Sequence, residues 1–539
     1  MAVYTQIMLD SMKKVEARRD KNTPITPERM SADEKTNLLQ TYHPDYITSQ
    51  FEELKIGPNK GEKAPLELAT ILQAQSLIKD KKIHLDRIDY DVDVLVIGGG
   101  GAGTAAAIEA NEAGANVMMV TKLRHGDANT MMAEGGIQAA DKESDSPIHH
   151  YLDAYGGGHF AAKKELVEKL VTEAPEAIKW LNGLGVEFDK TEDGSMVTTH
   201  GGGTSRKRMH AAKDYTGSEI MRTIRDEAQN QEIKTVEFTS AIEIILDDSG
   251  YAAGAVLLNM ETDEITIARA KTVIIATGGA GRIHYQGFPT TNHYGATADG
   301  LVIAYRAGAK LMYQETLQYH PTGTAFPEQI FGALVTEKVR SLGAKLLNID
   351  GEIFMNPLET RDVAAASLIR ECNERKKGVP TQHGYGIWLD TPMIEKIGGP
   401  GTIERSIPAM LRMFGKYDID IRKKPILVYP TLHYQNGGIE IDTNCMSTIK
   451  NLFVAGEAVG GIHGKNRLMG NSLLDIIVFG RDAGKAAAQA AQDAKVGTLS
   501  LEHVEKFAKE RKSAGIDGNE LSPLLLPTYT HGNPRFEEK

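Results

Sequence analysis

A short run of apolar residues followed by closely spaced glycines is the most informative pattern along the chain. Val92–Val96 are mostly apolar and β-branched, which predicts a buried parallel strand. Gly98, Gly100 and Gly103 follow, and Thr104–Ala113 is alanine-rich, which predicts a helix. A glycine pattern alone also occurs in plain turns. The strand before it and the helix after it favour a dinucleotide-binding unit, in which the helix N-terminus faces the phosphates.

The next strands indicate which nucleotide is bound. A second strand, Asn116–Lys122, ends in Thr121-Lys122, where a nicotinamide-binding unit usually has Asp or Glu for the ribose. Further along, Lys271–Gly279 predicts another strand that runs into a glycine turn. Two nucleotide-type turns in one chain favour a large cofactor such as FAD over a mononucleotide.

Composition narrows the class of protein. The chain has 539 residues, 41% of them hydrophobic and 25% charged, as in an ordinary globular protein with a sizeable core. This length favours about three or four domains, or one large interrupted domain. The net charge of -11 argues against nucleic-acid binding, which needs an excess of Lys and Arg.

The chain has two cysteines, Cys372 and Cys445. They cannot form a disulfide framework, and an iron–sulfur cluster needs about four ligands. We therefore expect no metal centre in this chain, and any onward electron transfer needs another chain. The sequence has no signal-peptide pattern and no long uncharged apolar stretch, so we expect a cytoplasmic protein without a transmembrane segment.

Both ends differ from the central part. Residues 1–89 are rich in charge and proline, with helices expected over Thr5–Arg19 and Pro65–Lys79. This extension either wraps the protein's own surface or contacts a partner subunit. Residues 496–539 form a short tail, in which the stretch from Leu524 to Tyr529 is either a docking segment or a disordered end.

Several motifs occur in an order that resembles the flavoprotein subunits of the succinate dehydrogenase and fumarate reductase family. Relatives of that family include soluble fumarate reductases and L-aspartate oxidase. The resemblance covers roughly residues 90–495. The motifs are Ala276–Arg282, Gln318–Gly323, Thr336–Arg340, Arg361-Asp362, Thr431–Gly438, Gly456-Glu457 and His463–Leu473.

The resemblance implies an α/β fold, with a Rossmann-like FAD-binding domain interrupted by an α+β capping domain. On this basis residues 90–314 and 433–495 form the FAD-binding domain and 315–432 the cap. The extension at residues 1–89 precedes it, and a short helical tail follows. The residues expected to bind FAD are Gly98, Gly100, Gly101, Gly103, Thr121, Lys122, Asn129, Thr130, Glu134, Gly135, Gly136, Ala276, Thr277, Gly278, Asp299, Glu457, Asn471, Ser472 and Leu473.

One of these residues departs from the family pattern. Respiratory members usually attach FAD through a histidine five residues before the Glu of the Ala-Glu-Gly-Gly motif, and Asn129 stands at that place. His125, four residues earlier, could be confused with it. We therefore predict noncovalent FAD, whose lower potential suits fumarate reduction better than succinate oxidation.

The resemblance also implies a C4-dicarboxylate site. Arg467 and His433 are expected to form a cationic clamp for one carboxylate. His320 and Thr336 are expected to bind the other, with Gln318 beside them. A single histidine is more often a hydrogen-bonded structural residue, but both histidines lie in motifs flanked by Pro or Gly.

Arg361 resembles the proton donor of the family, with Glu337 and Arg340 as the groups that reprotonate it. A guanidinium is a weak acid, so this role needs close contact with a proton source. Arg361 could instead pair structurally with Asp362 or Glu359. A second departure follows Arg340, since Ser341-Leu342-Gly343 replaces the usual Gly-Glu-Gly and removes one carboxylate.

These features together predict an FAD-dependent enzyme that reduces fumarate to succinate, or catalyses the reverse, with an iron–sulfur partner subunit. Membrane contact is expected only through partners. L-aspartate oxidase is the nearest alternative, but that enzyme tends to have Glu where this chain has His200. A related dicarboxylate as substrate, or a flavin electron-transfer subunit with a vestigial substrate site, remains a further alternative.

Overall fold

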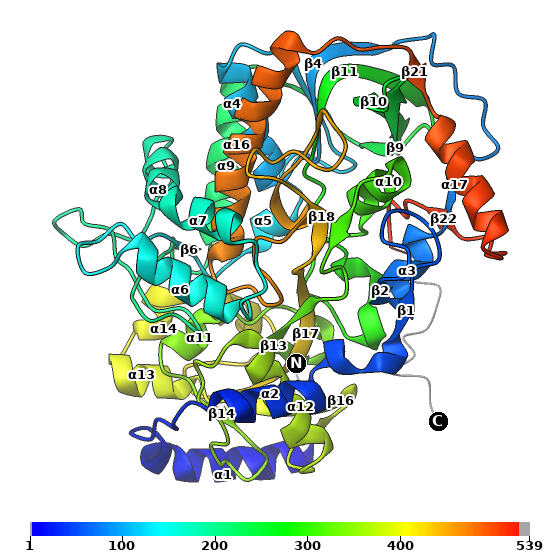
Figure 1. The fold of residues 1–539 in the computed structure, drawn as a ribbon. Coiled ribbons are helices and arrows are strands. Elements are labelled where there is room, and N and C mark those ends of the chain that lie inside the picture. The colour runs from blue at the N-terminus through cyan, green and yellow to red at the C-terminus, as the bar shows by residue number, and fades with distance from the viewer. Residues whose placement is uncertain (1–2, 528–539) are drawn as a thin grey trace.

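The structure is a computed structural model that describes residues 3–527 (Figure 1). Its largest sheet has eight strands in the order β21-β9-β10-β11-β4-β5-β8, with β19 also paired to β11. The contacts of β4 with β5 and β11, of β5 with β8 and of β11 with β19 are parallel, whereas β9, β10 and β21 add antiparallel pairs. The strands are β4 (Tyr90–Ile97), β5 (Val117–Val120), β8 (Lys234–Val236), β9 (Thr239–Asp247), β10 (Ala252–Asn259), β11 (Ile265–Ile275), β19 (Leu452–Val454) and β21 (Leu499–Ser500).

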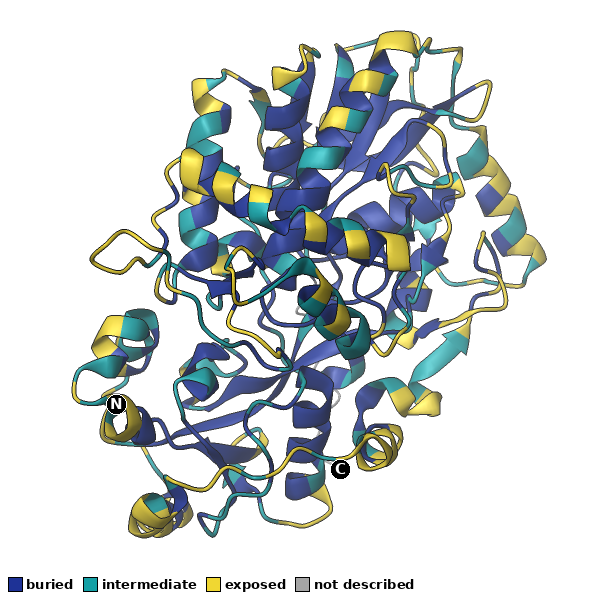
Figure 2. Cartoon of the chain, turned by 60° about the vertical axis from the view of Figure 1, so that its left-hand side comes forward, coloured by how far each residue is buried: buried dark blue, intermediate teal, exposed yellow. Residues whose placement is uncertain are grey.

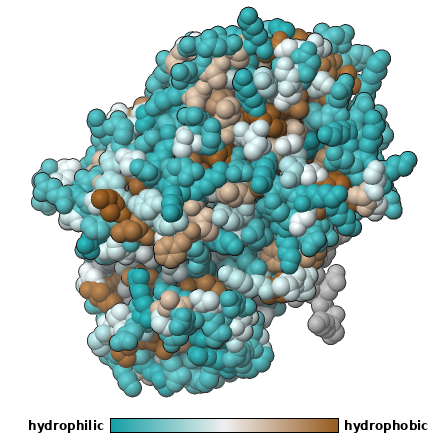
Figure 3. Space-filling view, viewed as in Figure 1, coloured by the Kyte–Doolittle hydropathy of each residue, from teal (hydrophilic) through white to brown (hydrophobic). Residues whose placement is uncertain are grey.

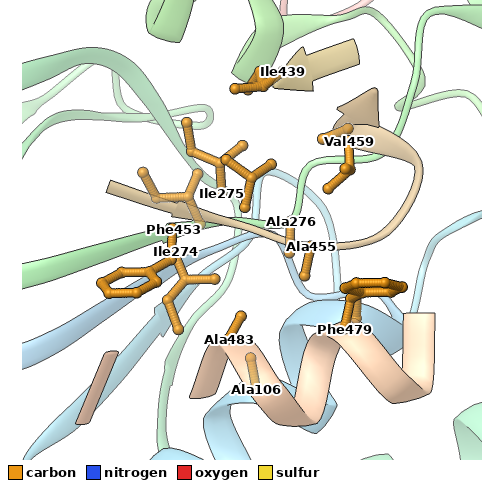
Figure 4. Close-up of a cluster of buried hydrophobic side chains, with 14 of the residues drawn as sticks. Ala106, Ile274, Ile275, Ala276, Ile439, Phe453, Ala455, Val459, Phe479 and Ala483 are labelled. Carbon is orange, nitrogen blue, oxygen red and sulfur yellow. The ribbon is translucent and has the colours of Figure 1, made fainter. Parts of the chain in front are cut away.

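Two helices pack very closely against one another beside this sheet. They are α4 (Gly101–Glu112) and α16 (Asn471–Asp493). A Cβ atom at Gly484 would lie 2.2 Å from the carbonyl oxygen of Ala106, so glycine is required where the two backbones meet. Figure 4 shows Ala106 and Ala483 in the hydrophobic core that these helices share with the sheet.

The nucleotide-binding unit has the predicted strand and helix with shifted ends. β4 is longer than Val92–Val96, and α4 begins at Gly101 instead of Thr104, with Gly100 as its N-cap. The helix begins early because the glycines that form the turn also form its first residues. The second strand, β5, is shorter than predicted and ends before Thr121.

A second sheet carries several of the predicted substrate-binding residues. Its order is β13-β17-β16-β14, with β15 paired to β16, and its own hydrophobic core surrounds the fully buried Trp388. β17 continues beyond residue 432 to Gln435, so His433 lies within a strand. The elements here are β13 (Leu317–Phe326), β14 (Leu346–Leu347), β15 (Val379–Thr381), β16 (Gly384–Leu389), β17 (Ile426–Gln435), α11 (Lys338–Ser341), α12 (Arg361–Asn373), α13 (Pro392–Gly398), α14 (Thr402–Ser406) and α15 (Pro408–Gly415).

Smaller elements occupy the stretches of chain between the strands of the two sheets. They are α5 (Asn129–Met132), β6 (Ile137–Gln138), α6 (Pro147–Gly157), α7 (Lys164–Thr172), α8 (Ala174–Gly183), β7 (Met209–His210), α9 (Thr216–Asn230), α10 (Asp299–Ala307), β12 (Leu311–Met312), β18 (Gly438–Glu440) and β20 (Val459–Gly460). Buried residues fill the interior of both sheets, and exposed residues lie on the outer faces of the surface helices (Figure 2).

The N-terminal extension lies on the protein's own surface, as one of the two interpretations predicted. α1 (Gln6–Asn22) places Met8, Met12 and Val15 in the core around Trp388. α2 (Ala32–Tyr42) starts with a capping box and packs against α12.

The helix predicted over Pro65–Lys79 is wrong in its second half. α3 (Leu66–Leu72) ends early, and β3 (Gln75–Ser76) then pairs with β22 (Leu521–Ser522) from the other end of the chain. The extension also contains the hairpin of β1 (Phe51–Glu53) and β2 (Lys63–Pro65). Pairing with a distant strand overrides the local helical preference of residues 75–79.

The C-terminal tail adds the edge strand β21 to the main sheet, then forms α17 (Glu502–Ser513) and continues through β22 to Pro527, packed on the main sheet domain. The rest of the predicted docking or disordered end, from residue 528, lies outside the described residues. The face shown in Figure 3 is mostly hydrophilic, with small scattered apolar patches. Within residues 3–527, every helix is too short or too polar to cross a bilayer.

Candidate active site

A cavity lies where the chain leaves the parallel strands of the main sheet. Its empty volume is about 1330 Å³, including space open to solvent. It is lined by residues that follow β4, β5 and β11 and by the start of α16. Ligands of open parallel sheets bind at this edge, outside the carboxyl ends of the strands. The predicted cofactor residues that line it are Gly98, Gly100, Gly101, Thr121, Lys122, Asn129, Thr130, Ala276, Thr277, Gly278, Asp299, Glu457, Ser472 and Leu473.

The glycine turn after β4 is built by close backbone contact. Gly98 has a φ of +120°, and a Cβ there would lie 2.2 Å from the carbonyl oxygen of Ala276. A Cβ at Gly103 would lie 1.9 Å from the carbonyl oxygen of Gly98. Gly103 therefore packs the helix against the turn and does not itself line the cavity. Gly101 and Ala102 place the N-terminus of α4 at the cavity wall, so the positive end of the helix dipole faces the cavity, and the Gly101 N–H donates to Thr130 Oγ1 at 3.1 Å.

Asn129, at the place of the family's attachment histidine, is held by its neighbours. Its amide nitrogen donates to Asn292 Oδ1 at 2.7 Å and to Glu457 Oε2 at 3.1 Å. Its amide oxygen accepts the backbone N–H of His293 at 2.6 Å. Asn129 thus joins three segments of the chain around the cavity, and it cannot form a covalent bond to a flavin as histidine does.

Four other predicted cofactor residues do not line the cavity. Asn471 Oδ1 contacts His150 Nε2 at 3.0 Å, so its side chain is engaged elsewhere. A Cβ at Gly136 would lie 2.5 Å from the His210 carbonyl oxygen, which gives this glycine a packing role. The remaining two are Glu134 and Gly135. Conversely, the sequence interpretation missed several lining residues that lie outside the glycine motifs, among them Thr239, Ser240, Ala241, Thr291, Asn292 and His293.

The predicted substrate residues come together at the end of the cavity that Arg467 lines. Arg361 Nη1 and Arg467 Nη2 both donate to the same atom, Gln318 Oε1, each at 2.9 Å. The amide nitrogen of Gln318 donates to the backbone carbonyl of Arg467 at 2.6 Å and to Asn466 Oδ1 at 3.0 Å. Gln318 is buried, and it fixes two guanidinium groups from separate motifs beside one another.

Glu337 lies behind Arg361 as the sequence predicted. Its carboxylate accepts Arg361 Nε at 2.8 Å and lies 3.4 Å from Arg340 Nη2. It also accepts the backbone N–H of Gly202 at 2.7 Å. Burial raises the pKa of Glu337, but Arg361 and Arg340 outweigh burial and hold it below its usual value.

The alternative structural partners of Arg361 are engaged elsewhere. Asp362 Oδ2 contacts His159 Nε2 at 2.6 Å, and Glu359 Oε2 lies 3.0 Å from Lys35 Nζ. Both acids are buried in these contacts. The side chain of Arg361 therefore points toward Glu337 and Gln318 and not toward its sequence neighbours.

His320 and His433 face one another from β13 and β17, with ring centroids 4.9 Å apart. Burial and the charge of Arg361 hold the pKa of each ring well below its usual value, so both are neutral at neutral pH. In the ligand-free protein, Arg467 is therefore the charged member of the predicted Arg467–His433 clamp. His433 Nδ1 contacts Thr291 Oγ1 at 2.7 Å, and Thr336 is buried nearby in the chain that precedes Glu337.

The buried charges of the site do not balance. Arg340, Arg361 and Arg467 contribute three guanidinium groups, and Glu337 is the carboxylate that contacts the first two. Arg467 has no carboxylate within ion-pair distance in the described part of the chain, and burial with Arg361 nearby lowers its pKa to about 9. Such a pocket attracts an anion. The buried guanidinium groups have already lost their contact with water, and a bound negative charge compensates for that loss.

Comparison with known proteins shows the family of the chain. The FAD binding domain family matches residues 93–473. The A subunit of the fumarate reductase (CoM/CoB) of Methanothermobacter marburgensis is 39% identical over 78% of this chain and 76% of its own length. The chain belongs to the fumarate reductase and succinate dehydrogenase flavoprotein family. The L-aspartate oxidase of Streptomyces coelicolor is also similar, at 35% identity over 76% of this chain and 70% of its own.

The solved structure of an E. coli quinol fumarate reductase, FrdA, gives a TM-score of 0.71 at 30% identity, covering 79% of this chain and 74% of that one. This flavoprotein is therefore an FAD-dependent oxidoreductase with the family fold. The cavity fits FAD, because the glycine turn, the N-terminus of α4 and Gly278, which has open space beside it, leave room for a dinucleotide along the strand ends.

A pH-dependent stability is expected from Glu457 in the flavin-free protein. Burial raises the pKa of Glu457 from its ordinary value of 4.5 to about 7. Since the folded state keeps this proton more tightly than the unfolded state, Glu457 contributes stability that is lost as pH rises from the unfolded pKa through about 7. A shift of this size corresponds to about 3 kcal/mol.

Glu457→Gln removes this loss and keeps one acceptor oxygen, whereas Glu457 uses one oxygen for the Gln435 N–H and the other for the Asn129 amide. Chemical denaturation measures the free energy of unfolding of each protein at about pH 5 and about pH 8. From the lower to the higher pH, the unchanged protein should lose about 3 kcal/mol more of this free energy than the variant does. An equal pH dependence in the two proteins would contradict the assignment.

Proposed function

We propose that this flavoprotein reduces fumarate to succinate, or oxidises succinate in the reverse direction, as the flavin-bearing subunit of an electron-transfer complex. The observation that supports this most directly is the excess of buried guanidinium groups at the end of the FAD cavity. A C4 dicarboxylate carries two negative charges, which match the net positive charge of three arginines and Glu337. When bound and reduced by two electrons from the partner subunit, FAD would supply the hydride to one alkene carbon of fumarate.

The two carboxylates of the substrate have separate binding groups in this proposal. Arg467 offers a planar, bidentate donor to one carboxylate, and neutral His433 donates a hydrogen bond beside it. His320 and Thr336 bind the other. Fixed positive charge around the carbon that becomes carbanion-like lowers the barrier, and the buried position strengthens this effect.

Arg361 donates the proton to the second alkene carbon. Its guanidinium is held by Glu337 and Gln318, so its position does not depend on the substrate. Glu337 returns a proton to Arg361 and receives one from Arg340, through contacts of 2.8 Å and 3.4 Å. This relay is short, because Ser341-Leu342-Gly343 brings no further carboxylate behind Arg340.

An iron–sulfur partner subunit is part of the proposal. Cys372 and Cys445 are buried in two different hydrophobic cores, so they do not lie together as cluster ligands. The M. marburgensis relative is named as one subunit of its fumarate reductase, which indicates an enzyme of more than one chain. Electrons would therefore reach the flavin from another polypeptide. Any contact with a membrane would likewise be made by a partner subunit.

L-aspartate oxidase is the second candidate, because a similar protein carries that name. Aspartate adds an ammonium group that needs an acidic neighbour. His200 has a pKa lowered by burial and by Lys207 and Arg208, so its surroundings are positive and disfavour an ammonium. The position of His200 thus favours a plain dicarboxylate. The intact arginine cluster likewise argues against a vestigial substrate site.

Arg361→Lys is the direct test of the proton donor. Lysine keeps the charge but cannot contact both Glu337 and Gln318 in the same way. With a reduced viologen as electron donor, fumarate reduction should fall by at least about a hundredfold, as expected for loss of a general acid. FAD absorbance should be retained.

Arg375→Lys is the matched control, since Arg375 follows the same helix and pairs at the surface with Glu371. Its turnover should be unchanged. Turnover of Arg361→Lys within tenfold of the unchanged enzyme would refute the assignment. The unchanged enzyme, given L-aspartate and oxygen, tests the alternative function. It should form no hydrogen peroxide; rapid peroxide formation would establish the oxidase instead.

The attachment of the flavin is tested by acid precipitation of purified protein. Because Asn129 cannot bond to the flavin covalently, the yellow colour should remain in the supernatant. A pellet that keeps its flavin absorbance after washing would show a covalent link, and peptide mapping would then locate it, starting with His293 and His433, which line the cavity, and with His125.

A further inference from the structure

The chain returns to the FAD-binding domain after α17, and we name residues 521–527 the C-terminal strap. β22, its first part, pairs with β3 of the N-terminal extension. The hydroxyl of Ser522 accepts Arg306 Nη2 at 2.6 Å, and its carbonyl accepts the same atom at 3.1 Å. Arg306 is ion-paired with Glu243, and both are fully buried. A buried pair of this kind fixes the place of the strap, since its groups cannot exchange their partners for water.

Beyond this anchor, the backbone of Leu525 contacts residues of the cofactor cavity. The Leu525 carbonyl accepts Lys122 Nζ at 2.7 Å and Thr297 Oγ1 at 3.3 Å. The Leu525 N–H donates to Asp299 Oδ1 at 3.2 Å. Its side chain is buried in a cluster with Ile78, and its φ is +64°.

Lys122 and Asp299 line the FAD cavity at the end of β5. In dinucleotide-binding folds the residue after the second strand grips the ribose, which places these two side chains at the adenosine end. Lys122 Nζ also contacts Asp299 Oδ2 at 2.5 Å and Thr297 Oγ1 at 2.7 Å. The strap thus supplies one of three acceptors that hold the ammonium group and one of the donors that hold the carboxylate.

We propose that the C-terminal strap is part of the FAD site, and that its Leu525 backbone orders Lys122 and Asp299 around the adenosine end of the cofactor. Without the strap, both side chains lose a buried hydrogen bond and gain access to solvent, so the bound nucleotide loses fixed partners. The effect concerns the nucleotide half of FAD and not the flavin ring. It is therefore independent of the dicarboxylate reaction proposed above.

The first experiment compares two truncated proteins with the full chain. Removal of residues 528–539 keeps every strap contact described here, whereas removal of residues 521–539 deletes them all. ADP is the probe, because it carries the adenosine and pyrophosphate of FAD without the flavin. Calorimetry on flavin-free protein should show ADP binding weakened at least about tenfold in the longer truncation and unchanged in the shorter one. FAD release should accelerate in the same protein.

A matched pair of point variants decides the matter if the longer truncation fails to fold. Both variants lose the leucine side chain. Leu525→Pro also removes the backbone N–H and forbids the positive φ, whereas Leu525→Gly keeps the N–H and allows the positive φ. ADP should bind at least about tenfold more weakly to the Pro variant than to the Gly variant. Equal ADP affinity in the two, or in the full chain and a folded 521–539 truncation, overturns the proposal. Fumarate turnover at saturating FAD reports separately on the substrate site.

Discussion

The amide oxygen of Gln318 holds two buried guanidinium groups side by side, and the active site depends on this contact. Two like charges repel strongly in a buried position, so Arg361 and Arg467 need fixed acceptors that keep them from moving apart. Gln318 provides one acceptor for both, and Glu337 neutralises part of the charge from behind. The result is a rigid pocket with a net positive charge, which a bound dianion would neutralise.

The architecture explains how these groups meet. Gln318 and His320 lie on β13 and His433 lies on β17, so the register of one antiparallel strand pair sets their spacing. Arg361 starts α12, which the N-terminal extension supports through α2. Arg467 comes from the segment that leads into α16, the helix packed on α4. The FAD cavity and the arginine cluster therefore share the same core elements.

Local sequence patterns predicted the parts of this site that depend on neighbouring residues. The strand, glycine turn and helix at residues 90–112 follow from apolar periodicity and from glycine chemistry. The family motifs alone were enough to predict that Arg361, Glu337 and Arg340 lie together. The neutral state of His433 was not predictable, because it results from burial and from the charge of Arg361, far away in sequence.

Local sequence patterns also could not predict contacts between segments that are far apart in the chain. Lys122 and Leu525 are separated by 403 positions, and neither belongs to a motif that indicates the other. The helix predicted to extend to Lys79 failed for the same reason, since Gln75–Ser76 pair with a strand from the other end of the chain. Tertiary pairing decided the structure where local preference was weak.

If the arginine pocket binds two carboxylates as proposed, it should distinguish ligands by their charge, and ligand affinity tests this most directly. Fumarate and crotonate are both four-carbon alkene acids, but crotonate has a methyl group in place of one carboxylate. Binding of each to the oxidised flavoprotein can be measured from the flavin difference spectrum. Fumarate should bind at least about a hundredfold more tightly, since a buried charge pair is lost with crotonate. Equal affinities for the two acids would contradict a dicarboxylate pocket.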